Sequence, residues 1–273
     1  MEKKILFVDL DGTLLNDEKE ISQENREAIE KAIAQGQTIV VTTGRARVST
    51  HKQVVRLGLD RPGCYAITSN GALIYNTYTG EVVFHTGIPR RLIRPVFDKA
   101  YAFGLHAQTY TDEYAVCERA GREKEYYTRT TLLPYRQVPD AVEALTEDPV
   151  KLLFIDLDNK ENLERFRVHM EPYARESGLD MFFSCDYYLE FLPHGVNKGS
   201  GVRYLSDLLG VPIAHTVAAG DAENDITMLE AAGTACVMKN AAPGMEAYGD
   251  YITSRDNNHS GIAEVIEKFL LDR

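Results

Sequence analysis

Apolar and polar positions alternate in a regular rhythm over the first part of the chain. The run Ile5-Leu6-Phe7-Val8 predicts a buried strand, because it is short, apolar and followed at once by turn residues. A helix is expected from about Ser22 to Gln35, with Ser22 as its N-cap and Gly36 as its stop. The β-branched run at 38–43 predicts the next strand.

The same rhythm continues to about residue 71. A second helix is expected to end near Leu57, and residues 65–68 predict a third strand. Asn70-Gly71 then gives the strongest hairpin signal in this part of the chain. Strands that alternate with helices in this way indicate a parallel sheet covered by helices.

The sequence pattern changes between about residues 84 and 193, where nine of the fifteen tyrosines lie. Helices are expected at 90–103 and 162–176, and strands at 151–156 and 181–191. The alternation of helices and strands then resumes. We expect a helix to residue 209, a strand at 216–219, a helix after 225, a strand at 235–237 and a helix at 261–271. We therefore expect a core formed by 1–83 and 194–273, with an α/β lobe inserted at 84–193.

Polar groups with catalytic potential lie at four places at the ends of expected core elements. Asp9 and Asp11 follow the first strand, and strand periodicity puts them on the same side. Thr43-Gly44 follows the second strand. Lys198 precedes a helix, and residues 220–225, Gly-Asp-Ala-Glu-Asn-Asp, join a strand to a helix. The carboxyl ends of parallel strands are where open α/β sheets bind their ligands.

Together these residues supply what phosphoryl transfer requires. Asp9 and Asp221 could bind Mg²⁺, which prefers oxygen ligands, with Asp225 either contacting the ion or supporting those ligands. Lys198 would offset negative charge, while Thr43 and Asn224 would donate hydrogen bonds to the phosphoryl group. If Asp9 is the nucleophile, Asp11, two residues later, could act as general acid on the leaving alkoxide and then as general base toward water.

Composition narrows the function further. The formal net charge of −11 argues against a nucleic-acid binder, whose footprint is basic. Because the first strand begins at residue 5 and no apolar run approaches the ~20 residues of a membrane span, we expect no signal peptide, no membrane partner and a cytoplasmic location. The four cysteines show no CxxC pair, so reduced and mostly buried thiols are expected.

The motifs DxDGTL, TTGR, NKG and GDxxND, in this order, resemble those of the haloacid dehalogenase (HAD) superfamily, and the large insertion resembles its Cof-type branch. This resemblance implies a Rossmann-like, mostly parallel core with an inserted α/β cap. It implies that Asp9 becomes an aspartyl-phosphate and that Asp11 is the acid/base whose carbonyl also binds Mg²⁺. It also implies that Asp221 is a metal ligand and that Thr43, Lys198 and Asn224 contact the phosphate or substrate. We further predict Asp225 at the metal site, either as a ligand or supporting the ligands, and Leu10 and Gly44 as additional phosphate or substrate contacts.

The expected activity is hydrolysis of small phosphomonoesters, with sugar phosphates or related metabolites as substrates, by a monomer or homodimer. Two alternatives stay open at this point. A phosphomutase would return the phosphoryl group to a hexose, and a sensor built on the same fold would bind a phosphate ligand without catalysis.

One segment of the inserted lobe imitates the first motif. Phe154-Ile155-Asp156-Leu157-Asp158-Asn159 nearly repeats residues 7–12 but lacks the Gly-Thr turn. Because a helix is expected to follow, Asp158 or Asn159 as its N-cap explains this segment without any catalytic role.

Overall fold

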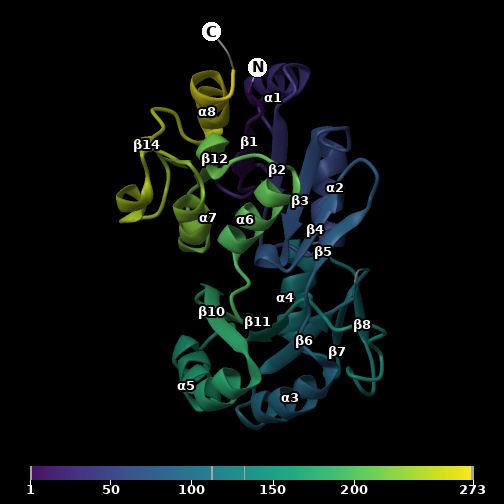
Figure 1. Cartoon of the computed structure of the whole chain (residues 1–273). Helices are drawn as coiled ribbons and strands as arrows, with labels where there is room; N and C mark the ends of the chain where they lie inside the picture. The colour runs from purple at the N-terminus through teal and green to yellow at the C-terminus, as the bar shows by residue number, and fades with distance from the viewer. Residues whose placement is uncertain (1, 112, 132, 272–273) are drawn as a thin grey trace. The chain divides into compact units, whose positions relative to one another are not determined.

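The computed structural model describes residues 2–111, 113–131 and 133–271, which form two compact units. The first unit comprises Met1–Gly44, Thr50–Phe84 and Asn197–Arg273. The second comprises His85–Val196 together with the short segment Arg45–Ser49. The second unit is therefore a large insertion between two halves of the first, and each unit has its own sheet and core (Figure 1).

The first unit is built on an eight-stranded sheet with the order β14-β13-β12-β1-β2-β3-β4-β5. The strands are β1 (Ile5–Val8), β2 (Thr38–Thr42), β3 (Cys64–Thr68), β4 (Leu73–Asn76), β5 (Val82–His85), β12 (Thr216–Gly220), β13 (Thr234–Val237) and β14 (Tyr251–Ile252). Pairing is parallel from β14 to β3, and β4 runs antiparallel to β3. Strand β1 lies at the centre, where the chain order reverses direction across the sheet.

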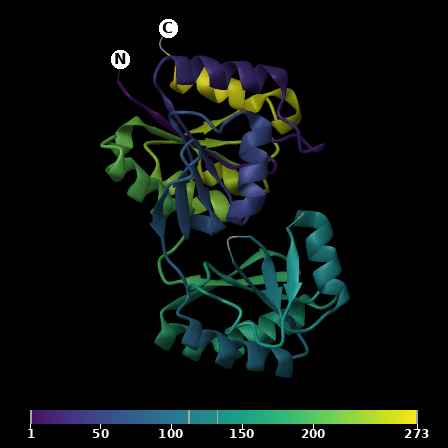
Figure 2. The same cartoon turned by 90° about the vertical axis from the view of Figure 1, so that its right-hand side faces the viewer.

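Helices cover both faces of this sheet (Figures 1 and 2). They are α1 (Gln23–Ala34), α2 (Arg47–Leu57), α6 (Lys198–Leu208), α7 (Ile226–Ala231) and α8 (Gly261–Phe269). On one face, Val202 of α6 and Met228 of α7 pack against the apolar side chains of β1, including Phe7. Helices α1 and α8 lie side by side, as Figure 2 shows, and contact β2 and β12 respectively. Because β1 is buried on both faces, its sequence is a continuous apolar run.

The second unit is a six-stranded sheet with the order β10-β11-β9-β6-β7-β8, in which only the β7–β8 pair is parallel. Its strands are β6 (His106–Tyr110), β7 (Ala115–Cys117), β8 (Tyr135–Gln137), β9 (Leu152–Ile155), β10 (Leu179–Cys185) and β11 (Tyr188–Pro193). Its helices are α3 (Ile93–Ala102), α4 (Arg122–Thr131) and α5 (Lys160–Ser177). Phe97 of α3 and Phe166 of α5 form a core with Phe154 of β9.

These observations confirm the expected fold class, a mostly parallel sheet core with an inserted α/β segment. Ser22 caps α1, since its hydroxyl accepts a hydrogen bond from the Asn25 N–H at 3.2 Å. The strand structure expected at 181–191 is present but is divided into two strands, β10 and β11, which form an antiparallel hairpin. Asp186 and Tyr187 are polar enough to turn the chain, but the apolar run on either side hides that turn in the sequence.

All four cysteines are free thiols, and Cys64, Cys117 and Cys236 are buried, as expected. Among the helices of the described residues, none has the length and apolar character needed to cross a membrane.

Candidate active site

Three polar side chains follow three neighbouring parallel strands of the first unit. Asp9 follows β1, Thr43 follows β2, and Asp221 follows β12. Val8 is in register with Val41 on one side and Ala219 on the other, so these strands end at the same edge of the sheet. The reversal of chain order beside β1 makes this edge the expected ligand site of an open α/β sheet.

Lys198 joins two of the carboxylates into a buried ion cluster. Its Nζ lies 2.6 Å from Oδ1 of Asp9 and 2.6 Å from Oδ1 of Asp225, and its side chain has no exposed surface. Asn197 and Ser200 form a capping box that begins α6 and so fixes Lys198 at the first helical position. A buried lysine between two carboxylates is tightly positioned, because its charge would otherwise be uncompensated.

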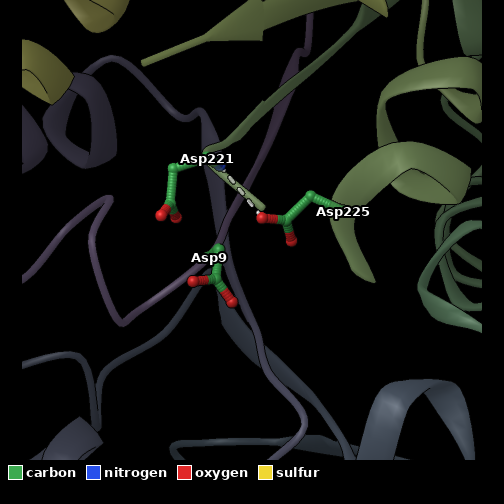
Figure 3. Close-up of side chains that lie close together, drawn as sticks. All are labelled: Asp9, Asp221 and Asp225. Carbon is green, nitrogen blue, oxygen red and sulfur yellow. Dashed lines mark hydrogen bonds between the residues drawn. The ribbon is translucent and has the colours of Figure 1, made fainter. Parts of the chain in front are cut away.

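Asp225 uses both of its carboxylate oxygens within the protein. Oδ1 accepts from Lys198. Oδ2 accepts from the backbone N–H of Asp221 at 3.0 Å, the bond dashed in Figure 3, and from that of Ala222 at 3.2 Å. The 3₁₀ turn η4 (Glu223–Asp225) brings this side chain back over the end of β12. Asp225 therefore ties the Asp221 backbone to Lys198.

The carboxylates of Asp9, Asp221 and Asp225 lie close together, and they come from the end of β1 and from residues 221–225, as Figure 3 shows. One oxygen of each lies within 4.8 Å of the others, which is close enough for a shared cation. The Thr13 hydroxyl donates to Oδ1 of Asp221 at 2.7 Å and orients that carboxylate. An all-oxygen cluster of this kind suits a hard divalent cation, with Asp9 and Asp221 as the better ligands since Asp225 is already engaged.

Burial shifts the protonation of this cluster when no cation is bound. Burial raises the pKa of Asp9 to about 8, because the attraction of Lys198 only partly offsets the loss of solvent. Burial also raises the pKa of Asp221 to about 6, although the Thr13 hydrogen bond opposes this. For Lys198, burial disfavours the charged form, but Asp225 and Asp9 outweigh it and raise its pKa. When all three carboxylates are deprotonated, the single charge of Lys198 does not balance them, and a bound cation would.

Asp11 lies outside this buried cluster. Its side chain is 38% exposed, and Oδ1 lies 2.8 Å from Nζ of Lys19. Gly12, with φ of +81°, turns the chain between Asp11 and Thr13, and a Cβ at this position would overlap the Asp221 carboxylate. A glycine is therefore required here both by the backbone conformation and by the close approach of Asp221.

The remaining predicted contacts lie near the same sheet edge with different exposure. Thr43 is buried, and its N–H donates to the Ile67 carbonyl at 2.9 Å. Gly44 packs against the side-chain amide of Asn70. Leu10 is buried beside Asp9, whereas Asn224 is exposed within η4.

Sequence reasoning missed three residues around this site. Thr13 orients Asp221, Lys19 contacts Asp11, and Asn240 donates from Nδ2 to the Gly12 carbonyl at 2.8 Å. The Gly12-Thr13 pair signals Thr13, but nothing in the sequence links Asn240 to a turn more than two hundred residues earlier.

The imitation of the first motif has a purely structural explanation. Asn159 is the N-cap of α5, and its side chain accepts from the Asn162 N–H at 3.1 Å. Asp156 accepts from the N–H groups of Asp158 and Asn159 and so stabilises the turn before the helix. This segment lies in the second unit and does not contribute to the acidic cluster.

Comparison with known proteins identifies the family. A model of the haloacid dehalogenase-like hydrolases matches residues 6–266. The protein named "Putative phosphatase YxeH" of Bacillus subtilis is 32% identical over 274 residues, with 98% of each chain covered. The 5-amino-6-(5-phospho-D-ribitylamino)uracil phosphatase YwtE of Bacillus subtilis is 27% identical over 287 residues, again with 98% of each chain covered.

Similarity to solved structures agrees with this assignment. A crystal structure of a Thermotoga maritima protein has a TM-score of 0.86 and 31% sequence identity, and the match covers 100% of this chain and 99% of that one. The motifs, the fold and the relatives together show that the chain belongs to the haloacid dehalogenase-like hydrolases of the Cof type and is a phosphoric monoester hydrolase.

Proposed function

We propose that the protein is a Mg²⁺-dependent phosphatase that hydrolyses small phosphomonoesters through a phosphorylated Asp9. The observation that carries this proposal is the buried cluster of Lys198, Asp9, Asp225 and Asp221 at the carboxyl edge of the central strand. Such a cluster places a nucleophile, a positive charge and a cation site within a few ångströms, as phosphoryl transfer requires.

Asp9 is the proposed nucleophile because it lies where the charges converge. Its Oδ1 is held by Lys198 and is the oxygen that we propose would also bind the cation, which leaves Oδ2 to attack phosphorus. Lys198 would also balance negative charge on the phosphoryl oxygens as the bond forms. Asp11 is more exposed and lies on the same turn, which suits a group that first protonates the leaving alkoxide and then deprotonates water.

The acidic cluster fits Mg²⁺, and we assign its binding to Asp9, Asp221 and the backbone carbonyl of Asp11. Because Asp225 already accepts three hydrogen bonds, we assign it the role of orienting Asp221 and Lys198. When bound, the cation would neutralise charge on the phosphoryl oxygens.

For the phosphoryl group itself we propose contacts from Thr43, Gly44, the Leu10 segment and Asn224. Thr43 and Gly44 follow β2, next to Asp9 in the sheet, and offer a hydroxyl and a backbone N–H. Asn224 is exposed near Asp221 and could donate from its amide. Each supplies a donor, which suits the acceptor oxygens of a phosphate.

We further propose that the first unit is the catalytic core and that the second is a cap that selects the leaving group. The substrates are proposed to be sugar or polyol phosphates and related metabolites. The name of the relative YwtE supports this class, since its substrate carries a phosphoribityl group.

A panel of sugar, polyol, nucleotide and cofactor phosphates, incubated with purified protein and Mg²⁺, tests the proposal. We expect release of inorganic phosphate that stops when the metal is chelated and resumes when Mg²⁺ is restored. Formation of an isomeric hexose phosphate without free phosphate would instead identify a mutase. Binding of a phosphate ester without turnover would identify a sensor.

A further inference from the structure

The turn between β3 and β4 has an unusual backbone. Ser69 and Asn70 both have positive φ, at 50° and 55°, although neither is a glycine. Both side chains are also buried. Two consecutive residues of this kind are costly, and such strain is found most often at functional sites.

This turn contacts two of the segments assigned to phosphate binding. The Asn70 N–H donates to the Thr43 carbonyl at 3.1 Å. A Cβ on Gly44 would lie 3.0 Å from Oδ1 and 3.2 Å from Nδ2 of Asn70, so the amide lies directly against the Gly44 backbone. A Cβ on Gly71 would overlap the carbonyl of Asn197, the residue before Lys198. The Asn70 amide is thus fixed beside Thr43–Gly44 and close to the start of α6.

Asn70 is 5% exposed as a residue. Its amide oxygen is buried and accepts no hydrogen bond from the described residues. Buried polar atoms are almost always satisfied in native proteins, and an unsatisfied acceptor destabilises the fold. An acceptor requires a donor, which the phosphoryl oxygens of an ester dianion cannot supply. A hydroxyl group of the leaving group can supply it.

We propose that Asn70 is a further substrate-binding residue, whose amide oxygen accepts a hydrogen bond from a hydroxyl of the leaving group next to the phosphate. This inference rests on the proposed phosphatase function and narrows its substrate class to hydroxylated phosphate esters. It also explains why the turn keeps a strained asparagine where glycine would be free of strain.

The test compares two substrates of which only the first carries hydroxyls on its leaving group: a polyol or sugar phosphate from the panel, and phenyl phosphate. The Asn70→Gly variant removes the amide but accepts the backbone conformation. We expect the ratio of kcat/KM values, sugar phosphate over phenyl phosphate, to fall about tenfold, which corresponds to ~1.4 kcal/mol. A purely structural role would lower both kcat/KM values equally and leave this ratio unchanged.

Two further variants serve as controls. Ser260→Gly makes the same kind of change at a buried residue with φ of +62° outside the site, and we expect an unchanged ratio. Asn70→Asp keeps an acceptor oxygen, so its ratio should stay near the wild-type value even if its added charge lowers both activities.

An unchanged ratio in Asn70→Gly would overturn the inference while leaving the phosphatase function intact. Wild-type protein that hydrolyses phenyl phosphate but no hydroxylated ester would do the same. Wild-type protein that hydrolyses neither substrate would instead refute the proposed function on which the inference depends.

Discussion

Lys198 connects the chemistry of the site at the scale of single residues. Its ammonium touches Asp9 and Asp225 at 2.6 Å each, and Asp225 in turn accepts hydrogen bonds from the backbone of Asp221 and Ala222. The proposed nucleophile, Asp9, and the proposed metal ligand, Asp221, are therefore linked through three contacts. Any change in one carboxylate should disturb the others, because neighbouring charged groups are energetically coupled.

The two similar motifs in the chain give a matched pair of substitutions. Asp9→Asn should lower kcat by about 10⁴-fold or more, the scale seen when an enzyme loses its nucleophile. Asp156→Asn should keep kcat within about threefold and lower the free energy of unfolding by about 1 kcal/mol, because Asp156 only stabilises the turn before α5 and accepts from the Asn162 side chain. Phosphate release and denaturant unfolding measure both effects. Equal losses of kcat would refute the assignment of Asp9.

Thr13 should act through Asp221. Thr13→Val keeps the shape of this buried side chain but removes the hydroxyl that contacts Asp221 at 2.7 Å. We expect the Mg²⁺ concentration for half-maximal activity to rise roughly 10- to 100-fold, as for other residues that orient metal ligands. Titration of activity with Mg²⁺ measures this, and Thr13→Ser should restore most of the affinity. An unaltered Mg²⁺ dependence in Thr13→Val would contradict the role.

At the scale of elements, the N-terminus of α6 positions Lys198. Asn197→Ala should lower the free energy of unfolding by about 1 kcal/mol, the usual effect of losing an N-cap, and should also reduce kcat because Lys198 is the next residue. Asn159→Ala removes the N-cap of α5 in the second unit and is the matched control. It should show a similar loss of stability with kcat retained. A comparable fall in kcat for both would mean that general destabilisation explains the effect.

Some elements could be predicted from the sequence because burial of apolar side chains alone determines them. β1, β2 and β12 are buried on both faces, so their apolar runs are visible without any tertiary information. β6 was missed because His106 and Gln108 are buried in it with polar partners, which breaks the apolar pattern. α4 was missed because Tyr127 is its only buried residue, so it has no apolar face.

Some residues of the candidate site could likewise be predicted from the sequence, and others could not. Asp9, Thr43 and Asp221 were predictable because strand ends of a parallel sheet meet at one edge. The contact of Asn70 with Gly44 was not, since it depends on a strained turn that looks like an ordinary hairpin signal. Whether these residues perform the proposed roles stays a prediction for the experiments above.

At the scale of the whole molecule, the acidic cluster should make stability depend on both pH and metal. In the folded, metal-free protein, burial raises the pKa of Asp9 to about 8 and the pKa of Asp221 to about 6. Each carboxyl group therefore keeps its proton until the pH approaches its own raised value. The unfolded chain loses these protons near pH 4, so the metal-free protein should lose stability as pH rises from about 4 to about 8. A bound cation would remove this loss by stabilising the charged carboxylates.

Saturating Mg²⁺ should therefore raise the melting temperature more at about pH 8 than at about pH 5. Calorimetry with and without Mg²⁺ at each pH measures the difference. Asp221→Asn should reduce the Mg²⁺-induced increase at the higher pH. An equal effect of Mg²⁺ at both pH values would contradict the coupling of metal and proton binding.

Asp9 is proposed to carry the phosphoryl group during turnover. The most direct test is to quench the enzyme with acid while it hydrolyses a good substrate, reduce it with borohydride and sequence its peptides by mass spectrometry. Reduction converts a phosphorylated aspartate to homoserine, so the proposed role of Asp9 predicts homoserine at position 9 only when substrate and Mg²⁺ are present. Homoserine at another aspartate would contradict it, and so would its absence from position 9 under conditions where a synthetic acyl phosphate is reduced in full.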